Sequence, residues 1–218
     1  MDLFARLLPR LIRTTDYRGA DLRQAELLNV SFEGCSLVAA ELTGARTGGN
    51  TEFAKATLTG AQMIGLRSAT RYLSLAGAKL DGANLTGINA DGIDLNGANA
   101  AHANFTAADI TNARLCGTKA PGATFINANL SHAHLSGADL RGANLTGANL
   151  DHAQLDDADL TGANLTGATF DNACLNGVKL EGANLTGVDL DMARSVTSVW
   201  LQGATLNGTK ISGHSIRF

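Results

Sequence analysis

From residue 75 to residue 190, a large apolar side chain recurs at nearly every fifth position of the chain. Seventeen of these twenty-four positions are Leu, and the residue two places earlier is Ala in eighteen cases, for example Ala83 before Leu85 and Ala143 before Leu145. A period of five fits neither the 3.6-residue helix nor the two-residue strand. The chain must therefore turn after each unit so that the apolar side chains face a common axis, which is the pattern of a solenoid.

A second period of twenty residues shows how many units complete one coil. The segment Ala-Asn-Leu-Thr-Gly occurs at 83–87, 143–147, 163–167 and 183–187. Because these copies are offset by multiples of twenty, four units of five make one four-sided coil, with residue n next to residue n+20. Neighbouring coils are then about 4.8 Å apart, the spacing of strands in a β-ladder.

The unit Ala-(Asp/Asn)-Leu-x-x resembles that of the pentapeptide-repeat family, and the resemblance extends from about Tyr17 to Ile216. It implies an all-β fold, a right-handed quadrilateral parallel β-helix of about ten turns, with the central Leu or Phe and the preceding small residue pointing inward. We predict a single β-helix over 16–218 and a short N-terminal helical cap over 1–15. The apolar stripe in that cap either covers the first coil or contacts a membrane surface or a partner.

The register of the repeat breaks near 46–50, 65–73 and 191–200. If Leu42, Met63 and Leu85 lie on one side, the first two breaks form bulges at about the same corner. Such bulges are either tolerated insertions or binding features. Trp200, within the third break, is expected to cover the end of the Leu core.

Two sides of the predicted rod differ in their outward residues. One side, which holds Asn84, Asn144 and Asn164, is neutral, and we expect its amides to hydrogen-bond from coil to coil. The next side is acidic, and its aspartates are the candidate partner face: Asp91, Asp109, Asp151, Asp171, Asp189 and Asp191. Like charges one coil apart cost about 1 kcal/mol in water-like surroundings, so either binding or solubility explains them. The opposing charges Lys79, Lys119, Arg141 and Lys179 are expected two sides away.

Candidate chemistry is sparse. His132 and His152 are twenty residues apart and His134 is nearby, but no third ligand of fixed geometry accompanies them, so we predict no metal site. Nucleotide-binding, nucleophile-elbow and zinc-protease motifs do not occur. Since the core is expected to be filled, we predict no cofactor and no enzyme activity. Cys35 is expected to point inward, and Cys116 and Cys174 outward.

Composition narrows the function only moderately. The formal net charge is −3, which argues against direct nucleic-acid binding, and the odd number of cysteines favours a reducing compartment. We expect a cytoplasmic protein, with the plastid and the thylakoid lumen left open. The first hypothesis is a scaffold that binds another protein and has no transmembrane segment. The alternative, implied by the resemblance, is a DNA mimic that binds DNA gyrase or a related topoisomerase, protects it from inhibitors, and dimerises through its C-terminal end. For either function, the backbone edges exposed at the last coil could pair with a second copy, so a homodimer through the C-terminal end is left open.

Overall fold

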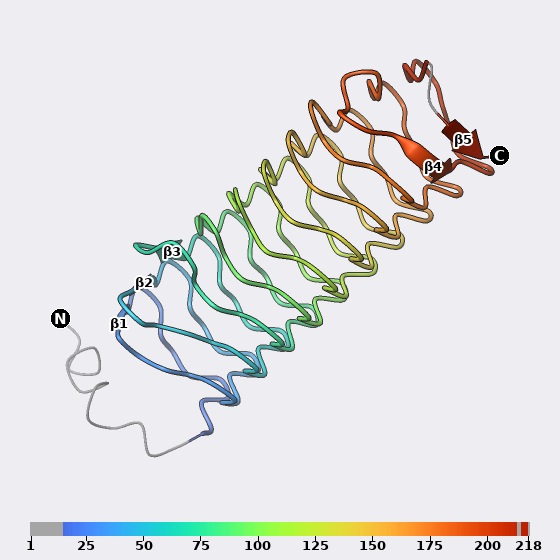
Figure 1. The fold of residues 1–218 in the computed structure, drawn as a ribbon. Helices are drawn as coiled ribbons and strands as arrows, with labels where there is room; N and C mark the ends of the chain where they lie inside the picture. The colour runs from blue at the N-terminus through green and yellow to red at the C-terminus, as the bar shows by residue number, and fades with distance from the viewer. Residues whose placement is uncertain (1–14, 213–214, 218) are drawn as a thin grey trace.

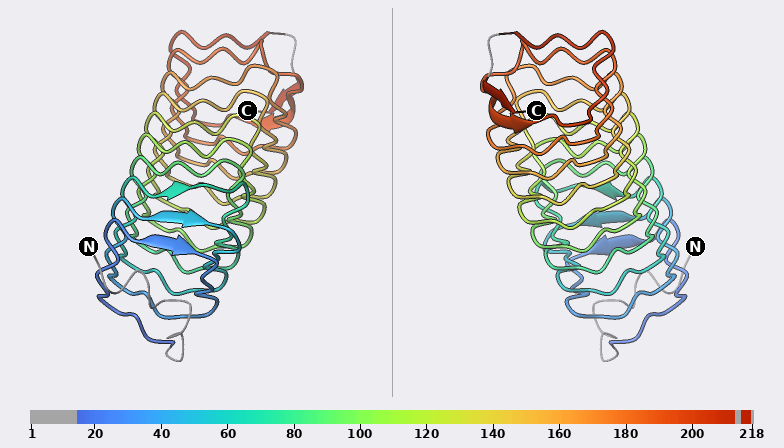
Figure 2. Two further views of the ribbon diagram at one scale, coloured as in Figure 1. Left: turned by 90° about the vertical axis from the view of Figure 1, so that its left-hand side faces the viewer. Right: turned by 90° about the vertical axis from the view of Figure 1, so that its right-hand side faces the viewer.

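The computed structural model describes residues 15–212 and 215–217, which form a straight-sided rod. Figure 1 shows the chain coiling steadily along one axis, from blue at one end to red at the other. Figure 2 shows the same coils from two further sides, each stacked on the one before. Within the described residues we find no helix that is both long enough and apolar enough to span a bilayer. The N-terminal helical cap falls on residues that lie outside those described, so it stays a prediction.

Each coil pairs with the next through parallel β-bridges at the predicted spacing. Asn84 bridges Asn104, and Asn144 bridges Asn164. The backbone N–H of Leu145 donates to the carbonyl of Asn164 at 2.7 Å, and the N–H of Asn164 donates to Ala143 at 2.9 Å. The predicted parallel β-helix with a coil of twenty residues is therefore confirmed.

The bridges form four files, one for each side of the rod. Side 1 carries Asp139 and Lys179, side 2 carries Asn144 and Asn164, side 3 carries Asp109 and Asn149, and side 4 carries His134 and Gln154. The chain passes through the sides in that order within every coil. Opposite charges on sides 1 and 3 are thus separated by the width of the rod.

Longer strands occur only near the ends of the described rod. On side 3, β1 (Glu26–Leu28), β2 (Arg46–Gly48) and β3 (Arg67–Ser68) form a parallel three-stranded sheet. Near the C-terminal end, β4 (Thr197–Trp200) pairs in parallel with β5 (Ser215–Arg217), with an irregularity between Thr197 and Val199. The remaining pairing consists of isolated bridges.

A tight turn links each side to the next and explains the Gly that ends many units. The N–H of Ala148 donates to the carbonyl of Leu145 at 3.0 Å, and Gly147 between them has a φ of +64°. The third residue of such a turn has a positive φ, which Gly and Asn adopt at a lower steric cost than other residues do. His132 and His152 occupy the same turn position with φ values of 59° and 61°.

The interior is filled by the repeated apolar side chains. The central Leu residues and the preceding Ala residues are buried along the whole array. Phe105 and Phe125 stack with their ring centroids 4.8 Å apart, and Phe32 stacks on Phe53 at 5.0 Å. Phe105 shares its coil with Ala90 and Ala100, and Phe125 shares its coil with Ala120, so core volume stays nearly even in this part of the rod.

All three interruptions of the register lie at the corner between side 3 and side 4. The regular step across this corner is five residues, as from Asn149 to Gln154. It is six residues from Arg46 to Glu52, seven from Arg67 to Ser74, and six from Asp189 to Ser195. Extra residues are thus admitted at one corner only. Side 4 keeps its bridges at all three interruptions, whereas on side 3 no bridge joins Thr169 and Asp189 at the third.

Trp200 does not cover the end of the core as the sequence led us to expect. Its side chain is 40% exposed, whereas its neighbours Val199 and Leu201 are buried. Trp200 bridges Lys179 and so continues the outward file of side 1. The extra residue at the preceding corner shifts the alternation by one, which turns Val199 inward and Trp200 outward.

Candidate protein-interaction face

Side 3 presents two files of outward residues, because each coil contributes the bridged residue and the residue two places later. From the N-terminal end, the first file consists of Glu26, Arg46, Arg67, Asn89, Asp109, Asn129, Asn149, Thr169, Asp189 and Lys210. The second file consists of Leu28, Gly48, Ala69, Asp91, Thr111, Ser131, Asp151, Asp171, Asp191 and Ser212. All six aspartates of the sequence-based candidate face lie in these two files, in the part beyond the third coil.

Some of these aspartates are already neutralised by neighbours. Asp91 makes an ion pair with Arg71 at 2.9 Å and accepts a hydrogen bond from Asn112. Asp189 makes an ion pair with Lys210 at 2.7 Å. Both pairs are exposed, so each contributes little stability by itself.

Asp109 accepts its contacts from uncharged groups. The hydroxyl of Thr111 donates to its carboxylate at 2.8 Å, and the amide of Asn129 donates at 3.3 Å. Its charge is therefore held in place without being cancelled.

The second file carries the most concentrated negative charge. One carboxylate oxygen of Asp151 accepts from the backbone N–H of Asp171 at 2.9 Å, and both oxygens of Asp191 accept from Ser212. In the part of the chain that the structure describes, no cation lies within ion-pair distance of Asp151 or Asp171. Successive carboxylates about 4.8 Å apart repel each other, so this strip favours a cationic partner.

The opposite end of side 3 is basic, which the sequence analysis did not recognise. Arg46 and Arg67 are paired in register on β2 and β3 and both are exposed. Together with Ser68, Ala69, Gly87 and Asn89 they line a shallow depression. Among the described residues, neither guanidinium has a hydrogen bond or ion pair. A signal was present in the sequence, because Arg46 and Arg67 occupy the position that is Asn or Asp in the regular repeat.

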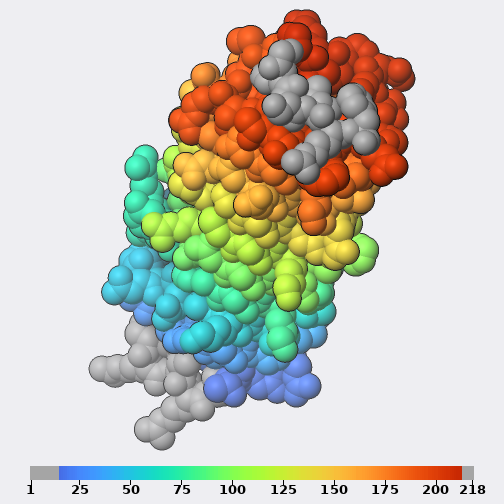
Figure 3. Space-filling view, turned by 45° about the vertical axis from the view of Figure 1, so that its right-hand side comes forward, coloured from blue at the N-terminus to red at the C-terminus, as the bar shows by residue number. Residues whose placement is uncertain are grey.

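The second insertion is fastened to the rod beside this depression. Tyr72 is 63% exposed and has a φ of +82°. A Cβ placed on Gly92 would lie 3.5 Å from its ring, and the Arg114 guanidinium lies 5.7 Å from its ring centroid. Figure 3 shows this segment, in teal, standing out from the flank of the rod. The bulge is thus held by a cation–π contact and by the Arg71–Asp91 pair.

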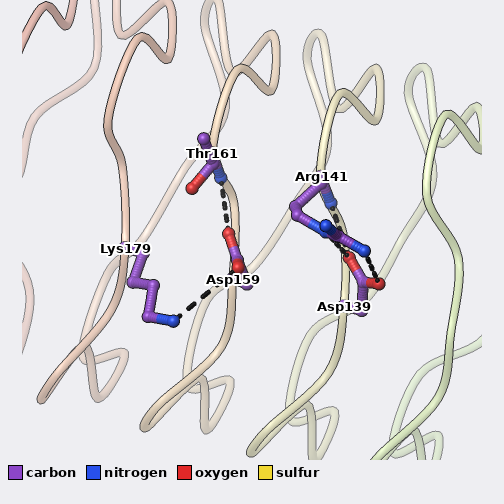
Figure 4. Close-up of polar contacts among 5 residues, drawn as sticks. All are labelled: Asp139, Arg141, Asp159, Thr161 and Lys179. Carbon is purple, nitrogen blue, oxygen red and sulfur yellow. Dashed lines mark hydrogen bonds and ion pairs between the residues drawn. The ribbon is translucent and has the colours of Figure 1, made fainter.

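Side 1 also carries charge, but there acidic and basic side chains are close neighbours. Figure 4 shows Arg141 paired with Asp139 at 2.7 Å, and Lys179 at 3.8 Å from Asp159, whose carboxylate also accepts from the N–H of Thr161. Hydrogen bonding from Arg141 holds the pKa of Asp139 below its usual value. On side 1 these two aspartates are paired with bases, whereas on side 3 Arg46 and Arg67 lie toward one end of the rod and Asp151 and Asp171 toward the other.

On side 2, the amides do not form the expected coil-to-coil ladder along the array. The Asn144 side-chain oxygen accepts from the N–H and the hydroxyl of Thr146, two residues later in the same coil. Asn164 and Thr166 repeat this arrangement, and of the array's amides on this side, only that of Asn84 donates to the preceding coil, to Gln62. The Thr after each Asn offers a nearer donor, so the local contact replaces the ladder.

The three histidines considered as metal ligands lie at two places on the rod. His132 and His152 stack with ring centroids 4.6 Å apart at the corner beyond the second file, and His134 contacts Gln154 on side 4. Within residues 15–212 and 215–217, no group of three or more His, Cys, Asp or Glu side chains is arranged to hold a metal ion.

The three thiols are free, and one of them lies differently from the prediction. Cys35 is buried and Cys116 is exposed, as expected from their positions. Cys174 was expected to face solvent but is buried, because Arg194 from the next coil donates to its sulfur at 2.7 Å. The third register break brings Arg194 over Cys174, which no single repeat could reveal.

A thiol-reactive reagent should therefore modify Cys116 alone in the folded protein. Burial raises the pKa of the Cys35 thiol and Arg194 covers Cys174, so only Cys116 offers an accessible sulfur. We expect one fast equivalent with Ellman's reagent, absent from Cys116→Ser, and three equivalents after denaturation. Fast modification of two thiols in the native Cys116→Ser variant would contradict this arrangement.

Comparison with known proteins agrees with this geometry. The family model described as pentapeptide repeats matches in eight copies, over residues 18–46, 78–117, 108–147, 123–162, 148–187 and 163–194. These matches span more than half of the chain. No curated protein matches the sequence.

Solved structures with the same architecture include HetL, a pentapeptide-repeat protein involved in heterocyst differentiation regulation in the cyanobacterium Nostoc sp. strain PCC 7120. HetL is 27% identical, with a TM-score of 0.56, over 97% of this chain and 94% of its own. Rfr23 from the cyanobacterium Cyanothece 51142 is 35% identical over 50% of this chain and 64% of its own, with a TM-score of 0.30. QnrB1, a plasmid-mediated fluoroquinolone resistance protein, is 20% identical over 86% of this chain and 90% of its own, with a TM-score of 0.48.

Proposed function

Because this chain belongs to the pentapeptide-repeat family, whose fold is a right-handed β-helix, we propose that it is a non-enzymatic scaffold that binds another protein through side 3. We infer a rod of about ten coils from the ten residues of the first file. The three free cysteines fit a reducing compartment such as the cytoplasm. With its core filled by side chains, the rod offers only its outer faces for function.

The segregation of charge on side 3 is the observation that carries this proposal. Asp151 and Asp171 have no cation in ion-pair distance among the described residues, and Arg46 and Arg67 have no anion. On side 1, by contrast, Asp139 is paired with Arg141 and Asp159 with Lys179 within the chain. Unneutralised charges of opposite sign at the two ends of one face favour a partner with the complementary arrangement, because such an arrangement steers encounter and fixes orientation.

A photo-crosslinking residue placed at Ser131, in the middle of side 3, tests the proposal directly. We expect an adduct of one defined mass at Ser131 and none with the crosslinker at Asn99 on side 1. Changing Asp151, Asp171 and Asp191 together to Asn should reduce the adduct at least about tenfold, since three successive negative charges of the second file are lost. Equal adducts from Asn99 and Ser131 would contradict a role for side 3.

The second candidate is the DNA mimic, favoured by the carboxylates of Asp151, Asp171 and Asp191 that follow one another coil by coil. Such a protein would bind DNA gyrase or a related topoisomerase in place of duplex DNA and protect it from inhibitors. A supercoiling assay with a quinolone distinguishes the two functions. Protection that is lost in the triple Asn variant supports the mimic, and unchanged inhibition removes it.

A further inference from the structure

The order of side chains along side 3 identifies a partner for this face, on the premise that the proposed function is correct. We propose that side 3 binds side 3 of a second copy of this chain, with the two rods antiparallel. In such a dimer the two-fold axis crosses the rods at their middle, so the first file of one copy faces the first file of the other in reverse order. Each contact then occurs twice, as in any isologous interface.

Read in opposite directions, the two first files are complementary along the whole rod. Full overlap of the ten coils gives five facing pairs: Glu26 with Lys210, Arg46 with Asp189, Arg67 with Thr169, Asn89 with Asn149, and Asp109 with Asn129. Two of these pairs join opposite charges, two can hydrogen-bond through amides, and Arg67 can donate to a hydroxyl. No pair joins like charges.

Other registers are less favourable. Shifting the rods by one coil in one direction places Glu26 against Asp189 and Asp109 against its own copy, and a shift in the other direction places Arg46 against Lys210. Parallel rods, related by a two-fold axis along their length, would place the first file of one copy against the second file of the other, which pairs no opposite charges and sets Asp189 against Asp191. Since like charges across an interface cost several kcal/mol, the charge pattern selects one orientation and one register.

The ends of the file form a four-charge arrangement in this register. Glu26 and Arg46 are neighbours in register on β1 and β2, and Asp189 and Lys210 form an ion pair at 2.7 Å. Antiparallel apposition places the acid of each pair against the base of the other. The signs then alternate around a square, at both ends of the dimer.

The second file is compatible with the same arrangement. Gly48 and Ala69 of one copy face Asp191 and Asp171 of the other. Because these two residues are small, the facing carboxylates have room to reach Arg46 and Arg67 beside them. The facing pair Asp91–Asp151 is the one like-charged pair, and Arg71 at 2.9 Å from Asp91 offsets it.

The available area predicts a salt-sensitive dimer. A side about 43 Å long and about 13 Å wide, from the spacing of strands and residues, buries roughly 1,200 Å² in total, at the lower limit of specific interfaces. Its polar composition makes charge pairing a main source of affinity. We therefore expect dimers at low ionic strength that dissociate as salt is added.

Complementary charge reversal tests the proposal by sedimentation velocity at low salt. The variant Arg46→Asp/Arg67→Asp and the variant Asp171→Arg/Asp189→Arg should each raise the dimer Kd at least about 100-fold, because each places like charges opposite one another. An equimolar mixture should recover a dimer containing one copy of each variant, since every reversed contact is again between opposite charges. The control Lys119→Asp/Lys179→Asp changes as many cations on side 1 and should leave the Kd within about twofold.

The proposal is overturned if the unaltered chain sediments as a monomer at every concentration, or if it dimerises but neither reversed variant weakens the dimer. It is also overturned if the mixed variants fail to associate while each keeps its native melting temperature. The proposed function can survive this failure. If the chain is a monomer and the crosslinker at Ser131 still captures a protein of a different mass, side 3 binds a partner, but that partner is not a second copy of this chain.

Discussion

Replacing Phe105 by Ala is expected to lower the free energy of unfolding by about 3–5 kcal/mol, the range for removing a buried aromatic ring. Phe105 is completely buried and stacks on Phe125 of the next coil at 4.8 Å. The neighbouring central positions of its coil include Ala90 and Ala100, whose short side chains cannot fill the cavity. The lost packing contacts therefore lie in the middle of the rod.

Urea unfolding followed by circular dichroism measures this change, with Ile126→Ala as the matched control. Ile126 is adjacent to Phe125 but points outward and is partly exposed, so its truncation should cost less than about 1 kcal/mol. In a double-mutant cycle, Phe105→Ala and Phe125→Ala should couple by about 0.5–1.5 kcal/mol through ring contact. A cost equal to that of Ile126→Ala would mean that Phe105 does not lie in a packed core.

The sequence predicts the fold well because one physical requirement is repeated in every unit. Leu145 and Leu165 must point inward and twenty residues must close a coil, so errors in one unit are corrected by its neighbours. The same redundancy places Asp109 and Asp151 on one side without any knowledge of three-dimensional contacts. Repetition thus converts a local pattern into a global geometry.

What the sequence could not show depends on contacts that occur only once or on a choice between competing contacts. The contact between Arg194 and Cys174 depends on one extra residue at one corner, and the outward Trp200 depends on the same shift. The local bond from Asn144 to Thr146 competes with a ladder of similar energy, and only geometry decides between them. In the proposed dimer, Arg46 faces the acidic strip of another copy. This contact depends on the order of whole coils, which no single repeat contains.

Deleting Gly147 is expected to destabilise the protein by at least about 4 kcal/mol, a size that single changes rarely reach. The turn between Leu145 and Ala148 requires all five positions of the unit, with Gly147 at positive φ. With four positions, either Ala148 or the next central residue, Leu150, cannot keep its inward direction. A one-residue slip reverses the side chains of the segment that follows, so the coil on each side of the deletion loses its bridges.

Deleting Asn50 should cost much less stability and is the matched control. Asn50 is the extra residue of the first insertion, and without it Gly49 is followed directly by Thr51 and Glu52, which restores the regular five-residue step from Arg46. We expect a cost of about 1 kcal/mol, mainly from the lost hydrogen bond between the Asn50 N–H and Asn29. Thermal unfolding of the two deletions at equal concentration compares them. Equal melting temperatures would show that the rod tolerates a short unit on any side, and the confinement of insertions to the corner beside side 3 would then need a cause other than packing.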